Sequence, residues 1–355
     1  MLSNFLLRFL ICCGMLLSFS IVEAEVSQTA NSRPLNINLI STRNGKGLQI
    51  DQNILLKALS KLGHRVLCLE LFAGVPEARH ADINIFLQFI DPELFSIADS
   101  NWLIPNPEWY TQDLALLEHI DLVLCKTGHA INIFADLGSK TYFLGFTSRD
   151  CIERDYDKDY TTFFHLAGGS LQKGTATIMD VWKNSPSLGK LFVLHHMPKP
   201  AEAAKLKNLK WINTYLPFED VRALQNQCGI HLCLSEAEGF GHYIMEGMST
   251  GAVVITTDAP PMNELITDKR CLVPYKKQAA QNLATNYYVD SAAFANTLNN
   301  LLKLPQSELE KIGQSNRSNF LIRDAMFLKR FDTLLKEYCN QPSRKFNPSN
   351  VSVGK

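Results

Sequence analysis

The sequence lacks an excess of either charge, a paired-cysteine motif and an apolar run of comfortable membrane-spanning length. Lys plus Arg and Asp plus Glu both total 35 in 355 residues, so the balanced charge provides no electrostatic footprint for nucleic acid. No Cys-x-x-Cys pair occurs and the nine cysteines are scattered, which argues against a zinc site and against a disulfide framework. Hydrophobic residues make up 46% of the chain, so a sizeable core can form and neither a disordered nor a fibrous protein is indicated.

The first 24 residues differ from the rest and are predicted to be a signal peptide. Arg8 precedes an apolar run from Phe9 to Val22, which is shorter than the roughly 20 residues of a membrane span, and Val22-Glu23-Ala24 resembles a cleavage site. An uncleaved membrane anchor over residues 1–24 is the alternative. The flanking charges favour an exported or membrane-associated body. The scattered cysteines instead fit a reducing compartment, so a cytoplasm-facing chain stays open.

Strand-like and helix-like segments alternate along the chain. Apolar residues have helical spacing in Leu48–Leu62, and strand-like runs flank this segment at Leu35–Ser41 and Arg65–Leu69. The alternation stops at the polar stretch Ser148–Asp159 and restarts at Phe163–Ala167. Strands that alternate with helices predict parallel sheets and a doubly wound α/β fold.

The pattern therefore predicts two similar α/β domains, at residues 35–150 and 160–320, followed by a closing helix at 321–340 and a loose tail at 341–355. The further predicted strands are Ile83–Phe89, Trp102–Ile104, Leu122–Cys125, Tyr142–Leu144, Leu191–Leu194, Leu209–Ile212, Ile230–Leu234 and Val253–Thr256. The further predicted helices are Thr175–Lys183, Glu219–Gln227, one that runs through Met248, and Ser307–Tyr338.

The segment 235–246 follows a predicted strand and opens a predicted helix. It contains Glu238-Gly239-Phe240-Gly241, and seven residues separate Glu238 from Glu246. Glycine lets the backbone approach a ligand closely, and a helix that starts near Gly241 points its N–H groups and positive dipole end at a diphosphate. Glu246 lies about one and a half turns into this helix and leans back toward its start, where it can accept hydrogen bonds from ribose hydroxyls.

This E-G-F-G and E-x7-E pattern, with the strand and loops at 251–265 that follow it, resembles the family-four-like, group 1 glycosyltransferases. The resemblance implies the GT-B fold, in which two Rossmann-like doubly wound domains face a central cleft and helices close the C-terminus. It also implies a hexosyltransferase that moves a sugar, with retention of configuration, from a nucleotide diphosphate sugar such as a UDP- or GDP-hexose to a hydroxyl acceptor. No metal or other cofactor is then required, Glu238 is catalytic beside the sugar, and Glu246 binds the donor with Gly239, Phe240 and Gly241.

Two more loops resemble parts of the donor site in this family. Gly168, Gly169 and Lys173 open the second domain as a phosphate loop, in which Lys173 is expected to pair with the diphosphate. Many relatives carry an arginine where Gly168 stands here, and a solvated lysine at a helix start is the alternative for Lys173. Gly45 and Gly47 resemble the glycine-rich loop of the first domain, although such a turn is common.

Ligands of open parallel sheets bind beyond the carboxyl ends of the strands, which makes the residues there candidates for the acceptor site. Glu108 is a candidate general base if it comes within about 3 Å of the acceptor hydroxyl, and a structural Asn106-Pro107 turn is the alternative. Lys126-Thr127 and Thr147-Ser148 also end strands and are expected to line the cleft. His242, directly after the glutamate-glycine motif, is expected to touch donor or acceptor.

Other functions stay open on the same fold. A nucleotide-sugar epimerase or hydrolase would use Glu108 with His242, and a non-catalytic carbohydrate- or nucleotide-binding protein would need only the binding residues. Asp155-Tyr156-Asp157 matches a metal motif of another glycosyltransferase fold, but it lies in the polar linker and is interpreted as solvated. The expected partners are a nucleotide sugar, whose base meets residues 211–215, a glycan, lipid or protein acceptor, and a membrane through residues 1–24, but no nucleic acid.

Overall fold

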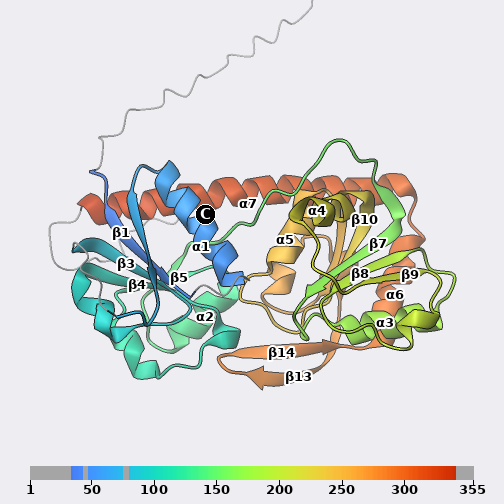
Figure 1. The fold of residues 1–355 in the computed structure, drawn as a ribbon, viewed down its shortest axis with the longest axis horizontal. Coiled ribbons are helices and arrows are strands. Elements are labelled where there is room, and N and C mark those ends of the chain that lie inside the picture. The colour runs from blue at the N-terminus through green and yellow to red at the C-terminus, as the bar shows by residue number, and fades with distance from the viewer. Residues whose placement is uncertain (1–32, 43–46, 75–79, 341–355) are drawn as a thin grey trace, which may run out of the picture. The chain divides into compact units, whose positions relative to one another are not determined.

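Two six-stranded parallel sheets, one in each half of the chain, form the frame of the structure (Figure 1). The computed structural model describes residues 33–42, 47–74 and 80–340. All of these except Arg33 belong to one unit of the chain, which begins at Pro34. The predictions for residues 1–24, for Gly45 and for the tail 341–355 therefore fall outside the described residues.

The first sheet has the strand order β2-β1-β3-β4-β5-β6, and every neighbouring pair is parallel. Its inner strand β3 is covered on both faces, and all seven of its residues are buried. The edge strand β2 has no buried residue. The elements of this half are β1 (Asn36–Ser41), α1 (Gly47–Lys61), β2 (Arg65–Glu70), β3 (Ala81–Leu87), β4 (Ala98–Ile104), β5 (Leu122–Cys125), α2 (Gly128–Asp136) and β6 (Thr141–Phe143).

The second sheet has the order β12-β11-β10-β7-β8-β9 and is also parallel throughout. Its elements are β7 (Asp159–Gly168), α3 (Thr175–Asn184), β8 (Leu191–His195), β9 (Leu209–Ile212), α4 (Phe218–Gln227), β10 (Cys228–Cys233), α5 (His242–Ser249), β11 (Val253–Thr257), β12 (Leu272–Val273) and α6 (Ser291–Leu302). Short 3-10 helices lie at Pro92–Ile97, Pro107–Trp109, Leu114–His119, Ala203–Lys205, Met262–Glu264 and Lys269–Cys271.

A two-stranded antiparallel hairpin stands apart from both sheets. It consists of β13 (Tyr275–Gln281) and β14 (Ala284–Val289) and lies below the second sheet in Figure 1. The backbone N–H of Tyr287 donates to the carbonyl of Glu236, 2.8 Å away, which attaches the hairpin to the loop after β10. At the other end its tip reaches the first half.

The last helix, α7 (Gln306–Asn340), runs along both sheets (Figure 1). In the second half, Asn316 donates to the carbonyl of Ala252 at 2.9 Å. In the first half, the hydroxyl of Tyr142 donates to the carbonyl of Arg330 at 3.1 Å, and that of Tyr338 donates to a backbone carbonyl of β3. A helix of 35 residues thus joins the two halves outside the connection 144–158.

A continuous apolar core also crosses between the halves. The ring of Phe146, after β6, meets the rings of Phe240 and Phe327 edge-on, with centroids 5.4 and 5.1 Å away. The carboxylate of Glu264, from the second half, accepts hydrogen bonds from the first two N–H groups of α2 at 2.8 and 2.7 Å. A carboxylate there is favoured because the N–H groups of a helix start have no partner within the helix.

The two-sheet prediction is confirmed, and most strand bounds agree to within two residues. Leu122–Cys125 and Leu209–Ile212 match β5 and β9 at both ends. The first strand of the second sheet was predicted to begin at Phe163, but β7 begins four residues earlier, at Asp159. The hairpin, α6 and β12 were not predicted.

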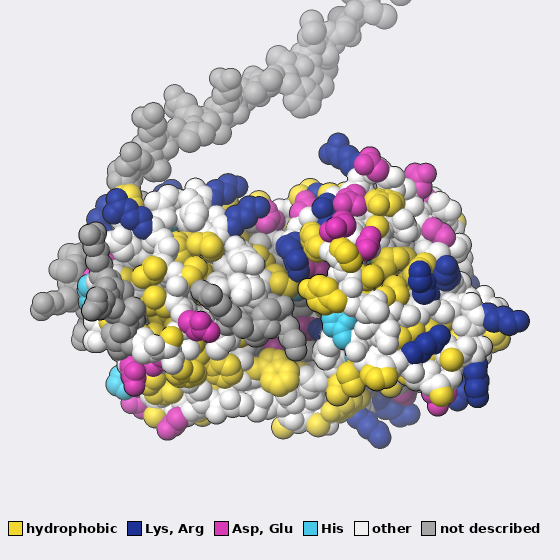
Figure 2. All heavy atoms as spheres, viewed as in Figure 1, with side chains coloured by type: hydrophobic (Ala, Val, Ile, Leu, Met, Phe, Trp, Pro, Cys, Tyr) yellow, Lys and Arg dark blue, Asp and Glu magenta, His cyan; other side chains and the backbone are white. Residues whose placement is uncertain are grey.

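The surface carries both charges in a mixed pattern. On the face drawn in Figure 2, basic and acidic side chains are interspersed with apolar ones, as the equal numbers of the two charges lead one to expect. Among the described residues, no helix is both long and apolar enough to span a membrane.

The packing of α7 against the second half can be tested at Gly313. A Cβ at this position would lie 2.1 Å from the carbonyl oxygen of Gly251, so the backbones must move apart in Gly313→Ala. We expect a loss of about 1–3 kcal/mol in the free energy of unfolding, because overpacking forces such shifts. Ser318→Ala, at an exposed position of the same helix, is the control and should leave stability unchanged or slightly raised. Denaturant melts that put both variants at the parent value would show that this helix contact is loose.

Candidate functional site

The strand order of the second sheet creates a switch point between β7 and β10. The chain leaves these neighbouring strands toward opposite sides, and such a crevice beyond the carboxyl ends is where α/β sheets bind ligands. The loop after β7 carries Lys173, directly before the start of α3, and the loop after β10 carries Glu238. The two segments that the sequence singled out therefore lie side by side at the expected place.

Lys173 and Glu238 form an ion pair in this crevice. Both side chains are largely buried, with 18% and 12% of their surface exposed. The hydroxyl of Ser235 donates to the same carboxylate oxygen and lies next to the hydroxyl of Tyr243. The ammonium of Lys173 lies 4.2 Å from the centre of the Tyr243 ring, which adds a cation–π contact. Tyr243 is a site residue that the sequence did not identify.

Helix α5 begins at His242, after Gly241 in the left-handed region at φ 104°. The helix follows β10 and therefore starts beyond the carboxyl edge of the second sheet. Glu246, on the second turn, is buried, and its Oε2 accepts from the amide of Gln225 at 3.2 Å. Its Oε1 lies 3.3 Å from Nε of Arg149 but has no hydrogen-bond partner among the described residues.

The glycines predicted to bind the donor have different surroundings. Gly168 ends β7 at φ 56°, and its carbonyl lies 2.7 Å from Nδ1 of His195 and 2.8 Å from the N–H of His196. Gly169 is exposed, and Gly47 is exposed at the start of α1. Phe240 is buried against Phe146 in the core between the halves, as described above.

The first sheet has its own switch point between β1 and β3, and buried polar side chains gather there. Asp51 projects from α1, Gln88 follows β3, Asn106 follows β4 and Lys126 follows β5. Each of them is at most 8% exposed. Buried polar groups at the carboxyl ends of three strands and near the start of α1 make this edge the counterpart of the crevice in the second sheet.

These side chains form one hydrogen-bonded chain that reaches the second half. Nε2 of His242 lies 2.8 Å from Oδ1 of Asp51, and the ammonium of Lys126 lies 2.9 Å from Oδ2 of Asp51. Lys126 also donates to the amide oxygen of Asn106 at 2.5 Å, and Asn106 donates to Gln88 at 3.0 Å. The start of α5 in the second half is thereby connected to the loops after β3, β4 and β5 in the first half.

The charges within this chain balance one another. Burial alone would raise the pKa of Asp51, but the ammonium of Lys126 and the hydrogen bond from His242 outweigh it, so the pKa lies below its ordinary value. The ammonium of Lys126 also lies 5.3 Å from the centre of the Phe146 ring. Asp51 is therefore ionised at neutral pH despite its burial.

Glu108, on the loop after β4, is a second buried carboxyl of this region. Burial raises its pKa to about 7, although Lys126 and Lys173 act in the opposite direction. Its Oε2 is buried and has no hydrogen-bond partner among the described side chains. A Cβ at Gly239 would lie 2.9 Å from Oε1 of Glu108 and 2.1 Å from Oδ1 of Asn106, so this glycine lets the two halves meet.

The hairpin tip fixes the backbone of the Glu108 loop. Asn282, at φ 52°, donates to the carbonyl of Glu108 at 2.6 Å, and Gln281 donates to the same carbonyl at 3.2 Å. The N–H of Leu283 donates to the carbonyl of Pro107 at 3.2 Å. The hairpin thus bridges the loop that carries Glu238 and the loop that carries Glu108.

Sequence reasoning identified Glu108, Lys126 and His242 but missed Asp51 and Gln88. Asp51 occupies a position on the apolar face of α1, with Leu48 and Leu55, and this placement was a readable signal. Gln88 was assigned to the end of a strand that in fact stops at Leu87. It adopts φ 69°, a conformation unusual for a non-glycine residue and invisible in the sequence.

The remaining predicted positions are also placed. Ser148 Oγ lies 3.1 Å from Nδ1 of His242, and Thr147 donates to Asp324 of α7 at 2.8 Å. Residues 154–157, which include the metal-like motif, are exposed on the connection between the sheets. Within the described part of the chain, no group of three or more His, Cys, Asp or Glu side chains is arranged to hold a metal ion.

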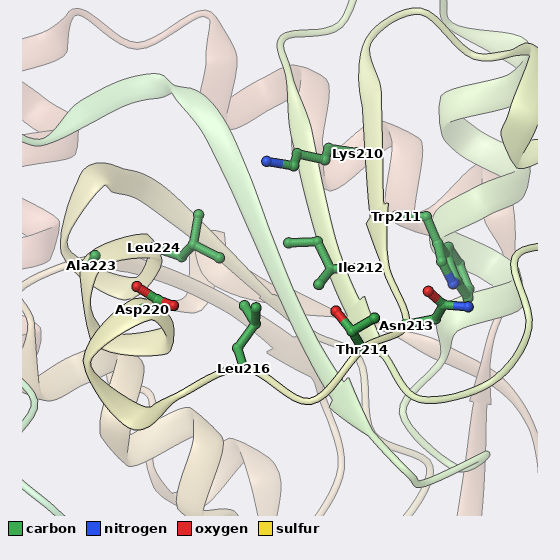
Figure 3. A pocket seen from close by; sticks show the side chains of 9 residues that line it. All are labelled: Lys210, Trp211, Ile212, Asn213, Thr214, Leu216, Asp220, Ala223 and Leu224. Atoms are coloured by element: carbon green, nitrogen blue, oxygen red, sulfur yellow. The ribbon is translucent and has the colours of Figure 1, made fainter.

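A cavity of about 520 Å³ lies between the edge strand β9 and helix α4 (Figure 3). The segment after β9 that was predicted to meet the base forms part of its wall. The lining residues are Lys210, Trp211, Ile212, Asn213, Thr214, Leu216, Asp220, Ala223 and Leu224. Asp220 and Leu216 point into the space between the helix and the strand in Figure 3.

Residues 195–319 match the family described as glycosyl transferases group 1. This match confirms the resemblance to group 1 glycosyltransferases for residues 195–319 of the second half. No curated protein matches the sequence significantly.

Solved structures confirm the GT-B fold. A glycosyltransferase from Rickettsia africae superposes with a TM-score of 0.66 at 11% identity, over 87% of this chain and 100% of that one. Sucrose-phosphate synthase from Thermosynechococcus elongatus gives 0.63 at 13% identity, over 83% and 97%. Anabaena HepE in complex with UDP-glucose gives 0.59 at 12% identity, over 85% and 99%. At such identities the likeness concerns the fold alone.

The buried pair of Lys126 and Asp51 can be tested with a double-mutant cycle. Lys126→Met leaves a carboxylate buried without its cation, and we expect a loss of about 3–5 kcal/mol in the free energy of unfolding. Lys126→Met combined with Asp51→Asn removes both charges and should be more stable than Lys126→Met alone. Urea denaturation of the parent, the two single variants and the double variant measures the coupling. Additive effects would mean that the two charges do not stabilise each other.

Proposed function

We propose that this chain, whose second half is a group 1 glycosyltransferase domain on a GT-B frame, transfers a hexose from a nucleotide diphosphate sugar to a hydroxyl acceptor. The observation that carries the proposal is the meeting of Lys173, Glu238 and the start of α5 at the switch point of the second sheet. A cation and a helix N-terminus at one crevice suit a diphosphate. A separate carboxylate, Glu246, is placed on the second turn of the same helix.

In this proposal the donor takes the second half. Lys173 and the N–H groups of α5 bind the diphosphate, and Glu246 accepts hydrogen bonds from the ribose. The base enters the region of residues 211–215, next to the cavity between β9 and α4. A UDP-hexose is the first donor to try, because HepE, which shares the fold, is solved with UDP-glucose.

The acceptor takes the first half, where Glu108 serves as base. The acceptor hydroxyl forms a bond to the anomeric carbon on the same face from which the diphosphate leaves, and its proton passes to Glu108. The bond between that carbon and the donor phosphate oxygen breaks, and its electron pair leaves with the nucleotide diphosphate. Lys173 and the helix start stabilise the charge that develops on the leaving group, and Glu238 lies beside the sugar. The family resemblance implies retention of the anomeric configuration and no metal ion.

Residues 1–24 are proposed to direct the chain to export or to a membrane. They lie outside the described residues, so this part of the proposal depends on the apolar run between residues 9 and 22 alone. A nucleotide-sugar epimerase or hydrolase differs from a transferase in that it converts the donor without an acceptor. A non-catalytic binding protein differs in that it leaves the donor unchanged with every acceptor.

The donor site is tested by thermal unfolding of the full chain with UDP, GDP or ADP. A nucleotide at 100 times its dissociation constant adds about 2.7 kcal/mol to the free energy of unfolding. We expect one nucleotide to raise the melting temperature of the parent and not that of Glu246→Ala, because the ribose loses its carboxylate partner. Glu93→Ala, at an exposed position of the first half, is the control for loss of one carboxylate and should respond as the parent does.

If no nucleotide shifts a folded parent, the donor site is wrong. If a nucleotide binds, incubation of the parent with the matching nucleotide sugar and a mixed set of sugar acceptors follows. Transfer supports the proposal, whereas loss of donor without acceptor favours the hydrolase or epimerase. An unchanged donor in the presence of every acceptor favours a binding protein.

A further inference from the structure

We propose that Lys126 is a positioning residue for the acceptor base, which it couples to the donor helix through Asp51 and His242. The inference rests on the proposed function, because it concerns the acceptor side of the same cleft. Neither Asp51 nor Lys126 needs to touch a substrate for this role. What they determine is where Glu108 lies and when it can accept a proton.

The position of Glu108 depends on Asn106. Asn106 precedes the 3-10 turn Pro107–Trp109, and its carbonyl accepts the N–H of Trp109 at 3.0 Å. Its amide oxygen is held by Lys126 at 2.5 Å and its amide nitrogen donates to Gln88 at 3.0 Å. These two hydrogen bonds hold the side chain of Asn106 in place, and with it the start of the turn that carries Glu108.

The position of Lys126 depends in turn on the second half. Asp51 accepts from Lys126 with one carboxylate oxygen and meets Nε2 of His242 with the other, at 2.9 and 2.8 Å. His242 is the first residue of α5, the helix that carries Glu246. A displacement of α5 on donor binding therefore reaches Lys126 through two short hydrogen bonds.

The carboxyl of Glu108 is aimed at the place where the halves meet. Its Oε1 lies beside Gly239, where a side chain would occupy the space, and Gly239 directly follows Glu238. Its Oε2 is buried and without a partner among the described residues. A buried carboxyl oxygen without a hydrogen-bond partner costs free energy. The carboxyl of Glu108 is therefore suited to accept a hydrogen bond from an acceptor hydroxyl beside the loop that carries Glu238.

The charges around Glu108 predict in which direction its pKa should move when Lys126 or Asp51 is replaced. Burial, the largest influence, raises its pKa to about 7; Lys126 and Lys173 lower it, and Glu238 raises it. The neighbours from the hairpin, Gln281 and Asn282, are neutral. Loss of the Lys126 charge should therefore raise the pKa of Glu108. Loss of the Asp51 charge leaves Lys126 uncompensated and should lower it. Because Glu108 accepts a proton only when ionised, transfer should fall as pH drops through this pKa.

The decisive experiment titrates Glu108 itself in the full chain. With glutamate labelled at the carboxyl carbon, the signal of Glu108 is identified by its loss in Glu108→Gln. We expect a midpoint near 7 in the parent, roughly one pH unit higher in Lys126→Met and lower in Asp51→Asn. Lys126→Arg, which keeps the charge, should restore the parent midpoint. If Lys126→Met does not fold, Asp51→Asn alone tests the sign.

The pH dependence of transfer from UDP-glucose is the second readout. The acid limb of kcat/KM should move in the same direction as the midpoint in each variant and disappear in Glu108→Gln. Equal midpoints in Asp51→Asn and the parent, or shifts of both variants in one direction, would overturn the inference. The UDP thermal shift of each variant separates the two failures: if UDP binds and the midpoints do not move, only the inference fails. If the midpoints move as expected but no nucleotide binds, the proposed function fails.

Discussion

One buried ammonium group, that of Lys126, lies at the centre of a chain of hydrogen bonds that connects both halves of the molecule. Removing a charge from water costs several kcal/mol unless a counter-charge and hydrogen bonds replace the water. Lys126 is 4% exposed and finds its counter-charge on Asp51 and a further acceptor on Asn106. Because the second oxygen of Asp51 meets His242, satisfying a charge of the first sheet requires a residue of the second. The start of α5 is thus held against the first half by electrostatics as well as by the aromatic contacts of Phe146.

The same constraint explains why glycine stands at position 239. The two switch points bring the loop after β10 and the loop after β4 together, and both loops carry carboxylates. Gly239 has no side chain, so Asn106 can approach the backbone and still reach Lys126. The carboxylate of Glu264, from the second half, likewise accepts hydrogen bonds from the first N–H groups of α2 in the first half. The polar contacts between the halves are therefore made by loops that follow the carboxyl ends of the parallel strands.

The sequence was informative where burial imposes a pattern. A buried parallel strand reads as a short apolar run, so β5, whose four residues are all buried, could be predicted to the residue. The edge strand β9, in which only Leu209 is buried, was predicted to the residue as well. The strand β13 has no such pattern, because all but its last residue are exposed and its contacts lie in the backbone and at the tip. The glutamates and Lys173 could be chosen from spacing and from the family resemblance. That Lys173 faces Glu238, or that Glu108 lies beside Gly239, depends on tertiary packing that no local pattern encodes.

The groups proposed to bind the donor are paired with charged side chains of the protein. Lys173 holds Glu238, and Arg149, whose guanidinium lies 4.8 Å from the centre of the Phe218 ring, approaches Glu246. In the proposed function, a diphosphate would compete with Glu238 for Lys173, and a ribose would compete with Arg149 for Glu246. Glu238 would then remain held by Ser235, free to face the sugar. The affinity for the donor would then depend on the difference between the contacts that Lys173 and Glu246 make with the donor and those that they make with Glu238 and Arg149.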